Sequence, residues 1–415
     1  METETQQLDF IAASHRLKNI VNRTPLQYNQ HLSTKYNCEV YLKREDLQVV
    51  RSYKLRGAYN MISQLSPEKL QRGVVCASAG NHAQGVAYSC NSLGTKGVIF
   101  MPEITPKQKV NQTRMFGNGM VEIILIGDTF DDCLAEALEY TKLHQLTFVP
   151  PFDNLQIIEG QGTVGVEILE DLPEVDTIIM PVGGGGLAAG VGQYIRQQKP
   201  NITLIGTEPE GAPSMYEALA HLEPVTLNDI NRFVDGASVK RVGRITYQLC
   251  KEVLDEMLLI PEGKVCTTIL KLYNEDAIVA EPAGALSVSA LDFCKEQIAG
   301  KKVVCIISGG NNDIDRLQEI KERSLLYEGL KHYFIVRFPQ RPGALRLFAN
   351  KVLGPSDDIT RFEFVKKTER ESGPALICIE LKDKEDYTSL INRMKEHRFD
   401  YKEINNDNNL FEYFI

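Results

Sequence analysis

Short runs of β-branched and apolar residues alternate with longer helical patterns between about residues 74 and 320. Runs that are apolar at nearly every position are typical of strands buried on both faces of a parallel sheet. Their alternation with helices predicts an α/β region in which helices cover open parallel sheets. We expect its strands at residues 74–78, 97–101, 121–126, 147–149, 176–180, 202–206 and 302–307.

The pattern changes near residue 325, after a charged helix at 313–327. The elements expected beyond it are a strand at 332–338, a helix at 343–352, strands at 359–366 and 375–381, a helix at 387–397 and a strand at 401–405. The order βαββαβ is that of a ferredoxin-like unit. The chain is therefore predicted to form a larger region, 1–325, and a C-terminal domain, 326–415. Within the larger region, a smaller subdomain at about 50–150 is expected to be inserted.

Composition is that of a soluble globular protein with more than one core, since the chain has 415 residues, 43% of them hydrophobic and 24% charged. The formal net charge of −9 leaves no broad basic surface, so nucleic acid is not an expected partner. The most apolar stretch, 177–192, is interrupted by Pro181 and four consecutive glycines, and therefore does not suit a membrane span. The first ten residues lack the layout of a signal peptide.

The cysteines are odd in number and scattered, and several lie in apolar runs; they are at positions 38, 76, 90, 133, 250, 266, 294, 305 and 378. This pattern predicts reduced, mostly buried thiols in a cytoplasmic protein. It favours neither a disulfide framework nor a zinc site, and we expect no metal centre.

Four consecutive glycines follow the apolar strand at 176–180 and precede the helical run at 188–198. Glycines allow several backbone N–H groups to approach one phosphate, and the helix that follows adds the positive end of its dipole. No lysine and Ser/Thr pair follows, which excludes a Walker-type loop. A dinucleotide fingerprint stays open, because Gly183, Gly185 and Ala188 fit G-x-G-x-x-A and Glu208 lies about twenty residues further on. This half of the chain therefore also suits a nicotinamide-dependent oxidoreductase.

Three further segments carry chemical groups at expected strand ends. Ser52–Ala58 contains Lys54 and follows a charged strand at 40–46, although a single lysine is more often a surface charge. Ala77–Gly85 forms a small-residue turn whose N–H groups suit a carboxylate, with Asn81 able to offer its amide to a ligand or to cap the backbone. Ser308–Asp313 follows the strand at 302–307, at the edge where open α/β sheets bind ligands.

These four segments, in this order, resemble the pyridoxal-5'-phosphate (PLP) enzymes of the tryptophan-synthase-β type (fold type II), and most closely the threonine dehydratases of isoleucine biosynthesis. The resemblance implies that Lys54 holds the cofactor covalently, that Asn81 contacts the pyridine 3'-oxygen and that Ser308 contacts the pyridine nitrogen. It assigns the cofactor phosphate to Gly183, Gly184, Gly185, Gly186 and Leu187, and the substrate to Ser78, Ala79, Gly80 and His82. From the residues alone, His82 is more typical of packing or of a helix start.

Two positions depart from the family pattern. Tyr53 stands where phenylalanine is common, which adds a hydroxyl beside the lysine. Ala79 stands where related serine racemases carry a second serine, the proton donor on the opposite face of the cofactor. The missing hydroxyl favours elimination over racemisation. Arg341–Leu345 resembles the start of an ACT-like regulatory domain, of which residues 326–415 provide one copy.

The resemblance implies dehydration and deamination of L-threonine to 2-oxobutanoate and ammonia, with Lys54 as the base. It also implies feedback regulation by isoleucine or valine and a homo-oligomer, either dimer or tetramer. A serine dehydratase or racemase with the same cofactor stays an alternative, as do the oxidoreductase and an inactive amino-acid sensor. Relatives use an acidic residue near the position of Glu208 for a cation, but one carboxylate does not make a metal site.

Overall fold

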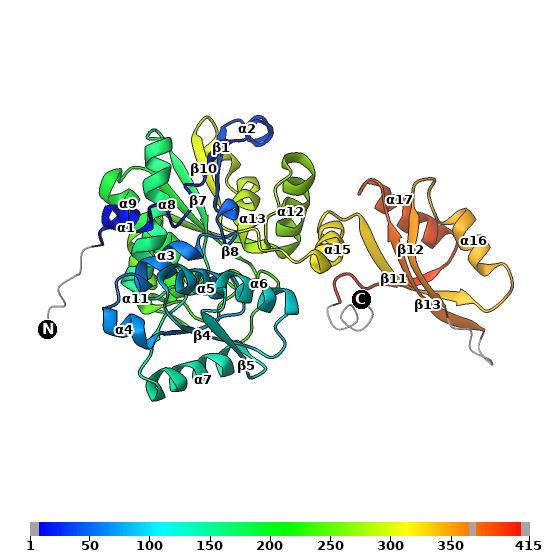
Figure 1. Ribbon diagram of the computed structural model, residues 1–415. Coiled ribbons are helices and arrows are strands. Elements are labelled where there is room, and N and C mark those ends of the chain that lie inside the picture. Colours follow the sequence, from blue (N-terminus) through cyan, green and yellow to red (C-terminus); the bar gives the residue numbers. More distant parts are fainter. Residues whose placement is uncertain (1–7, 365–370, 408–415) are drawn as a thin grey trace. The chain divides into compact units, whose positions relative to one another are not determined.

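The computed structural model describes residues 8–364 and 371–407 (Figure 1). The chain divides into two compact units, Met1–Ile314 and Asp315–Ile415. The division lies eleven residues before the expected boundary at 325 because helix α15 (Leu317–Tyr327) is part of the second unit. Glu322 on this helix accepts hydrogen bonds from Tyr333 Oη (2.7 Å) and Lys331 Nζ (2.6 Å), both on strand β11.

The first unit contains a six-stranded sheet in the order β1-β2-β10-β7-β8-β9. Its strands are β1 (Leu26–Tyr28), β2 (Glu39–Arg44), β7 (Thr177–Pro181), β8 (Thr203–Pro209), β9 (Glu256–Ile260) and β10 (Lys302–Ile307). All neighbours pair in parallel except β1 with β2. The sheet is therefore the expected parallel sheet with one added antiparallel edge strand.

Helices cover both faces of this sheet, as a parallel sheet requires. The helices α8 (Leu155–Asp171), α9 (Gly186–Gln198) and α11 (Arg244–Val253) share one core with Ile178, Met180 and Val304 of the strands. The helices α12 (Glu262–Asp276) and α13 (Pro282–Ser289) lie on the other side, as Figure 1 shows.

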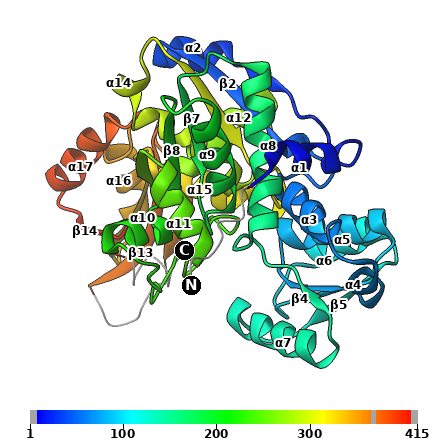
Figure 2. The same ribbon diagram turned by 90° about the vertical axis from the view of Figure 1, so that its left-hand side faces the viewer.

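A second parallel sheet lies between β2 and β7 in the chain and has the order β5-β4-β3-β6. Its strands are β3 (Val74–Ala77), β4 (Gly97–Met101), β5 (Val121–Leu125) and β6 (Thr147–Phe148). One face carries α3 (Lys54–Ile62), α5 (Asn81–Leu93) and α6 (Lys107–Gly117), and the other carries α7 (Phe130–Leu143), which is seen below the strands in Figure 2. The strands predicted for this segment are present.

The remaining elements of the first unit are short: α1 (Phe10–Leu17), α2 (Gln30–Tyr36), η1 (Glu45–Leu47), α4 (Pro67–Arg72), α10 (Ser214–His221), η2 (Ala290–Asp292), α14 (Lys295–Ile298) and, across the division, η3 (Ile314–Arg316). All nine cysteines are free and buried, and their burial was expected from their positions in apolar runs. Among the described residues, none of the helices combines the length and the apolar character that a membrane crossing needs.

The second unit has the predicted βαββαβ order: β11 (Lys331–Pro339), α16 (Ala344–Lys351), β12 (Asp358–Phe364), β13 (Ser372–Glu380), α17 (Asp386–Glu396) and β14 (Asp400–Glu403). Its sheet is antiparallel, in the order β12-β13-β11-β14. Edge-to-face aromatic contacts such as Phe348 with Phe399 fill the space between sheet and helices. The ferredoxin-like prediction is confirmed; residues 365 and 366, the expected end of one strand, lie outside the described residues.

Candidate active site

Three of the four predicted segments begin where a parallel strand ends. Strand β3 ends at Ala77, β7 at Pro181 and β10 at Ile307, each directly before a turn of small residues. The carboxyl ends of strands in an open α/β sheet are the usual place for a ligand. Hydrogen bonds join the turn after β3 and the segment of Lys54 to the loop after β10, and so connect predicted site residues of both sheets.

Lys54 is tied to the loop after β10 through the residues that precede it. The backbone N–H of Tyr53 donates to Ser308 O at 3.2 Å, and the N–H of Gly310 donates to Arg51 O at 2.9 Å. Ser52 thereby pairs with Gly309 in an isolated antiparallel bridge. This pairing places the predicted lysine beside the predicted pyridine contact, although more than 250 residues separate them in the chain.

The amine of Lys54 is partly buried and donates to Pro151 O at 2.8 Å. It lies 5.5 Å from the centre of the Tyr53 ring. Burial lowers the pKa of Lys54 to about 8, and the nearby Glu281 carboxyl opposes this shift. A larger fraction of the amine is therefore neutral near neutral pH, which is the form that attacks a carbonyl or takes a proton.

The glycine loop joins β7 to α9 along a path that only glycine can follow. Gly185 has φ +91°, and a Cβ at Gly184 would collide with the Phe152 ring. A Cβ at Gly183 would lie 2.9 Å from Ala237 Cα. The loop ends at the first turn of α9, which begins at Gly186 and contains the buried Leu187. The first N–H groups of a helix have no partner within the helix, and together with the helix dipole they make this the expected anion cradle.

Asn81 is held by side chains rather than by capping the backbone. Its Nδ2 donates to Glu281 Oε1 at 2.6 Å, and its Oδ1 accepts from Asn311 Nδ2 at 2.6 Å. Asn311 Nδ2 also donates to Gln84 Oε1 at 3.0 Å and to Val50 O at 2.9 Å. These bonds join the turn after β3 to the loop after β10.

The proposed substrate turn lies between β3 and α5. Ser78 Oγ accepts from the N–H of Gly80 at 3.3 Å, and Ala79 is partly buried. Open space surrounds the Cβ position of Gly80, so the turn has room for a ligand. His82 is buried and its Nε2 lies 2.9 Å from Val149 O. Burial and the Lys54 charge lower the pKa of His82 to about 3, as expected for a neutral packing residue.

Sequence reasoning missed Glu281, which is only 5% exposed and directly precedes α13. Burial and the neighbouring Asp235 carboxylate raise the pKa of Glu281 to about 7. Its signal in the sequence is one acidic residue within the otherwise apolar run at 278–286. Asp153 was missed as well: its carboxylate accepts the backbone N–H groups of Arg244, Ile245 and Thr246 and so holds the start of α11.

Glu208 has a structural role that does not suit a dinucleotide. Its buried carboxylate accepts from the N–H groups of Met215 (2.8 Å) and Tyr216 (2.9 Å) at the start of α10. Burial raises the pKa of Glu208 to about 8. A carboxylate that caps a helix from the interior is not available to a ribose hydroxyl, which weakens the nicotinamide alternative.

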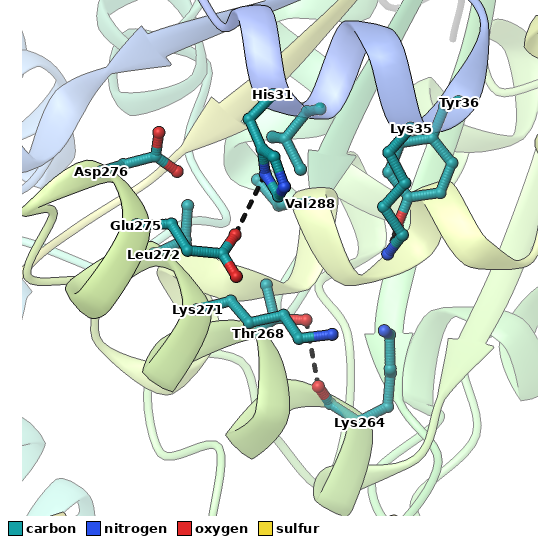
Figure 3. Close-up of a pocket in the computed structure, with 11 residues that line it drawn as sticks. His31, Lys35, Tyr36, Lys264, Thr268, Lys271, Leu272, Glu275, Asp276 and Val288 are labelled. Carbon is teal, nitrogen blue, oxygen red and sulfur yellow. Dashed lines mark hydrogen bonds and ion pairs between the residues drawn. The ribbon is translucent and has the colours of Figure 1, made fainter.

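A cavity of about 210 Å³ lies elsewhere, between α2, α12 and α13 (Figure 3). His31 Nδ1 lies 3.0 Å from a Glu275 oxygen, and Asn29 Nδ2 donates to Asp276 Oδ1 at 2.8 Å. None of the predicted site residues lines this cavity. It is therefore separate from the site around Lys54.

The residues around Lys54 fit a cofactor that carries an aldehyde and a phosphate. A primary amine with a lowered pKa suits an aldehyde, and the glycine cradle suits a phosphate. The buried hydroxyl of Ser52, two residues from Lys54, has no hydrogen-bond partner among the described residues. A polar atom left in this state is expected where a ligand completes the site.

Two largely parallel sheets with a lysine, a glycine loop and an amide near their strand ends are the features expected of a PLP-dependent enzyme. The chain belongs to the family of pyridoxal-phosphate dependent enzymes, whose profile matches residues 17–309. Residues 322–415 match the C-terminal regulatory domain of threonine dehydratase. The predicted family, cofactor and regulatory domain are thereby confirmed.

Curated relatives match over almost the whole chain. The biosynthetic L-threonine dehydratase of Halalkalibacterium halodurans is 57% identical, over 98% of both chains. That of Bacillus subtilis is 56% identical, over 100% of this chain and 99% of its own.

Solved structures match the part of the chain that carries the site. The processed threonine deaminase isoform 2 of Solanum lycopersicum is 38% identical with a TM-score of 0.73, over 76% of this chain and 92% of its own. A serine racemase of Dictyostelium discoideum is 33% identical with a TM-score of 0.68, over 74% of this chain and 98% of its own.

Proposed function

We propose that this enzyme converts L-threonine to 2-oxobutanoate and ammonia, the activity for which its curated relatives are named. The observation that carries the proposal is Lys54, whose amine is partly buried with a lowered pKa and whose preceding residues pair with the loop after β10. Lys54 holds the cofactor and then acts as the base. The same proposal assigns Asn81, Ser308 and the glycine loop to the cofactor. It assigns the substrate to Ser78, Ala79, Gly80 and His82.

When bound, the cofactor supplies an electron sink that stabilises the negative charge left at Cα. The chain's own residues position and move the proton. N–H groups of the turn at 78–82 bind the substrate carboxylate, and the neutral amine of Lys54 takes the Cα proton. The electrons of the broken Cα–H bond form the Cα–Cβ double bond as hydroxide leaves Cβ, and this hydroxide and the proton taken by Lys54 together balance as one water. The released enamine tautomerises to an imine, whose hydrolysis consumes one water and gives 2-oxobutanoate and ammonia.

Ala79 supports elimination over racemisation. Racemisation needs a second proton donor on the face opposite Lys54, and the methyl group of Ala79 carries no exchangeable proton. Serine dehydration by the same groups would give pyruvate. A serine dehydratase or racemase is therefore the second candidate, and the serine racemase among the similar structures is the observation that favours it.

Regulation, assembly and location complete the proposal. We propose that isoleucine, or valine, binds the C-terminal unit and changes turnover, which is supported by the match of residues 322–415 to a regulatory domain. A homo-oligomer, dimer or tetramer, and a cytoplasmic location are proposed as well. Nine free, buried cysteines support a reducing compartment.

The test combines a visible spectrum with chemical mapping. We expect the purified enzyme to be coloured, and borohydride reduction followed by peptide mapping to label Lys54. Lys54→Ala should lose the visible band and at least about 1,000-fold of the threonine turnover, since both the attachment and the base are removed. A colourless protein, or a label on another lysine, would refute the assignment. Comparison of threonine with L-serine and D-serine as substrates separates the second candidate from the first.

A further inference from the structure

Glu281 is a buried acid that the mechanism above does not use. It lies at the start of α13, and its backbone N–H donates to Gly309 O at 3.1 Å. Its carboxylate accepts from Asn81 Nδ2 at 2.6 Å. It therefore contacts two of the turns that form the site, one from each sheet.

The Asn81 amide can point in only one direction. Its oxygen faces the Asn311 amide nitrogen, a donor, and its nitrogen faces the Glu281 carboxylate, an acceptor. A flipped amide would place oxygen against carboxylate and nitrogen against nitrogen. An amide nitrogen carries two hydrogens, and Glu281 takes one of them. The second hydrogen remains for an acceptor in the site.

Charged and titratable groups of both sheets face Glu281. Asp235 disfavours the charged form of Glu281, whereas Lys109 and Lys54 favour it. Lys109 on α6 and Asp235, in the segment between α10 and α11, form an ion pair of 2.6 Å with each other. The Tyr53 ring is the fourth neighbour, and burial together with Glu281 raises the pKa of its hydroxyl.

We propose that Glu281 is a positioning residue of the active site, which holds the Asn81 amide so that its second hydrogen meets an acceptor oxygen of the bound cofactor. Its ionisation changes the charge that this oxygen experiences through the amide. The inference rests on the proposed contact between Asn81 and the cofactor. Glu281 acts through Asn81 and is not itself a base in the reaction.

Two substitutions separate the hydrogen bond from the ionisation. Glu281→Gln keeps an oxygen that accepts from Asn81 but cannot ionise, so cofactor binding should stay close to wild type. Glu281→Ala removes the acceptor, and we expect about tenfold weaker cofactor binding in reconstitution. The second readout is the visible absorbance of the holoenzyme between pH 5 and 9. The wild type should show a transition near pH 7, and both variants should lack it.

Two neighbours test the same assignment without changing Glu281. Asp235→Asn removes the carboxylate that opposes ionisation and should move the midpoint to lower pH. Lys109→Met removes a cation that favours ionisation and should move it to higher pH. These variants keep the proposal testable if the changes at Glu281 prevent folding.

The outcomes distinguish this inference from the proposed function. Three results would overturn the role of Glu281. The holoenzyme could show no transition, or the spectrum of Glu281→Gln could titrate like that of the wild type. The third is a midpoint that stays unchanged in both Asp235→Asn and Lys109→Met. The proposed function would still stand if the band depended on Lys54. A band that survives Lys54→Ala would remove the proposed site itself, whatever the Glu281 variants show.

Discussion

The chemistry of the site depends on the environment of one amine. Burial lowers the pKa of Lys54 to about 8, so its neutral fraction rises with pH through that value. We expect the rate at which cofactor-free enzyme takes up pyridoxal phosphate to rise with the same midpoint, because only the neutral amine attacks the aldehyde. Stopped-flow absorbance measures this rate. A midpoint near 10.5, the ordinary value for a lysine, would contradict the lowered pKa.

His82 should make the fold sensitive to acid. Its pKa is about 3 in the folded chain and near 6.5 when unfolded, so the unfolded state binds the proton first as the pH falls. The free energy of unfolding should therefore decrease below about pH 6.5, by about 2 kcal/mol at pH 5. Urea unfolding at pH 7 and 5 tests this. His82→Asn should show a smaller loss than the wild type, and an equal loss in both proteins would contradict the prediction.

Local patterns predicted part of the site. Lys54 and the glycines at 183–186 were expected in the candidate site because they lie in motifs of consecutive residues that, taken together, resemble the family. Glu281 could not, because its partner Asn81 lies 200 residues away in the chain and only folding brings them together. Phe152 likewise contacts the glycine loop only in three dimensions.

At the scale of elements, the strands that could be predicted are those buried on both faces, such as β7 and β10, because their short apolar runs end at turn residues. The strands β1 and β9 had no such signal. Strand β1 has three residues, too few for an alternation of apolar and polar positions to be recognised. Strand β9 is a half-buried strand at the edge of the sheet. Edge strands keep one side open to solvent, so their sequences differ less from those of loops.

Helices α8 and α9 approach closely because of glycines on the facing surfaces. A Cβ at Gly190 of α9 would collide with Ile158 O on α8, whereas a Cβ at Gly165 of α8 would lie at 3.4 Å, an ordinary contact. Gly190→Ala should cost about 1–3 kcal/mol of stability, the usual cost of overpacking. Gly165→Ala should be neutral or stabilising by up to about 1 kcal/mol, because alanine is the better helix former. Denaturant unfolding of the two variants measures the difference; equal effects would contradict the close approach.

At the scale of the whole molecule, the chain combines a catalytic unit with a regulatory unit, and the division at Ile314 and Asp315 shows where to separate them. A chain that ends at residue 325 would retain most of α15, including Glu322. It would lack Tyr333 and Lys331, which donate hydrogen bonds to Glu322. We therefore expect a chain that ends at Ile314 to be the better test of the catalytic unit.

A chain of residues 1–314 should keep the visible band and threonine turnover, because Lys54, Asn81, Ser308 and the glycine loop all lie within it. Isoleucine should no longer change its turnover.

In the full chain, a coupling free energy of about 1–3 kcal/mol would change the apparent threonine affinity about 5-fold to 150-fold. Coupling is reciprocal, so threonine or an unreactive analogue should change isoleucine affinity by the same factor. Titration of isoleucine into both chains by calorimetry, with turnover measured alongside, tests the two statements together. Isoleucine inhibition that persists in residues 1–314 would place the effector site in the catalytic unit and refute the role proposed for residues 315–415.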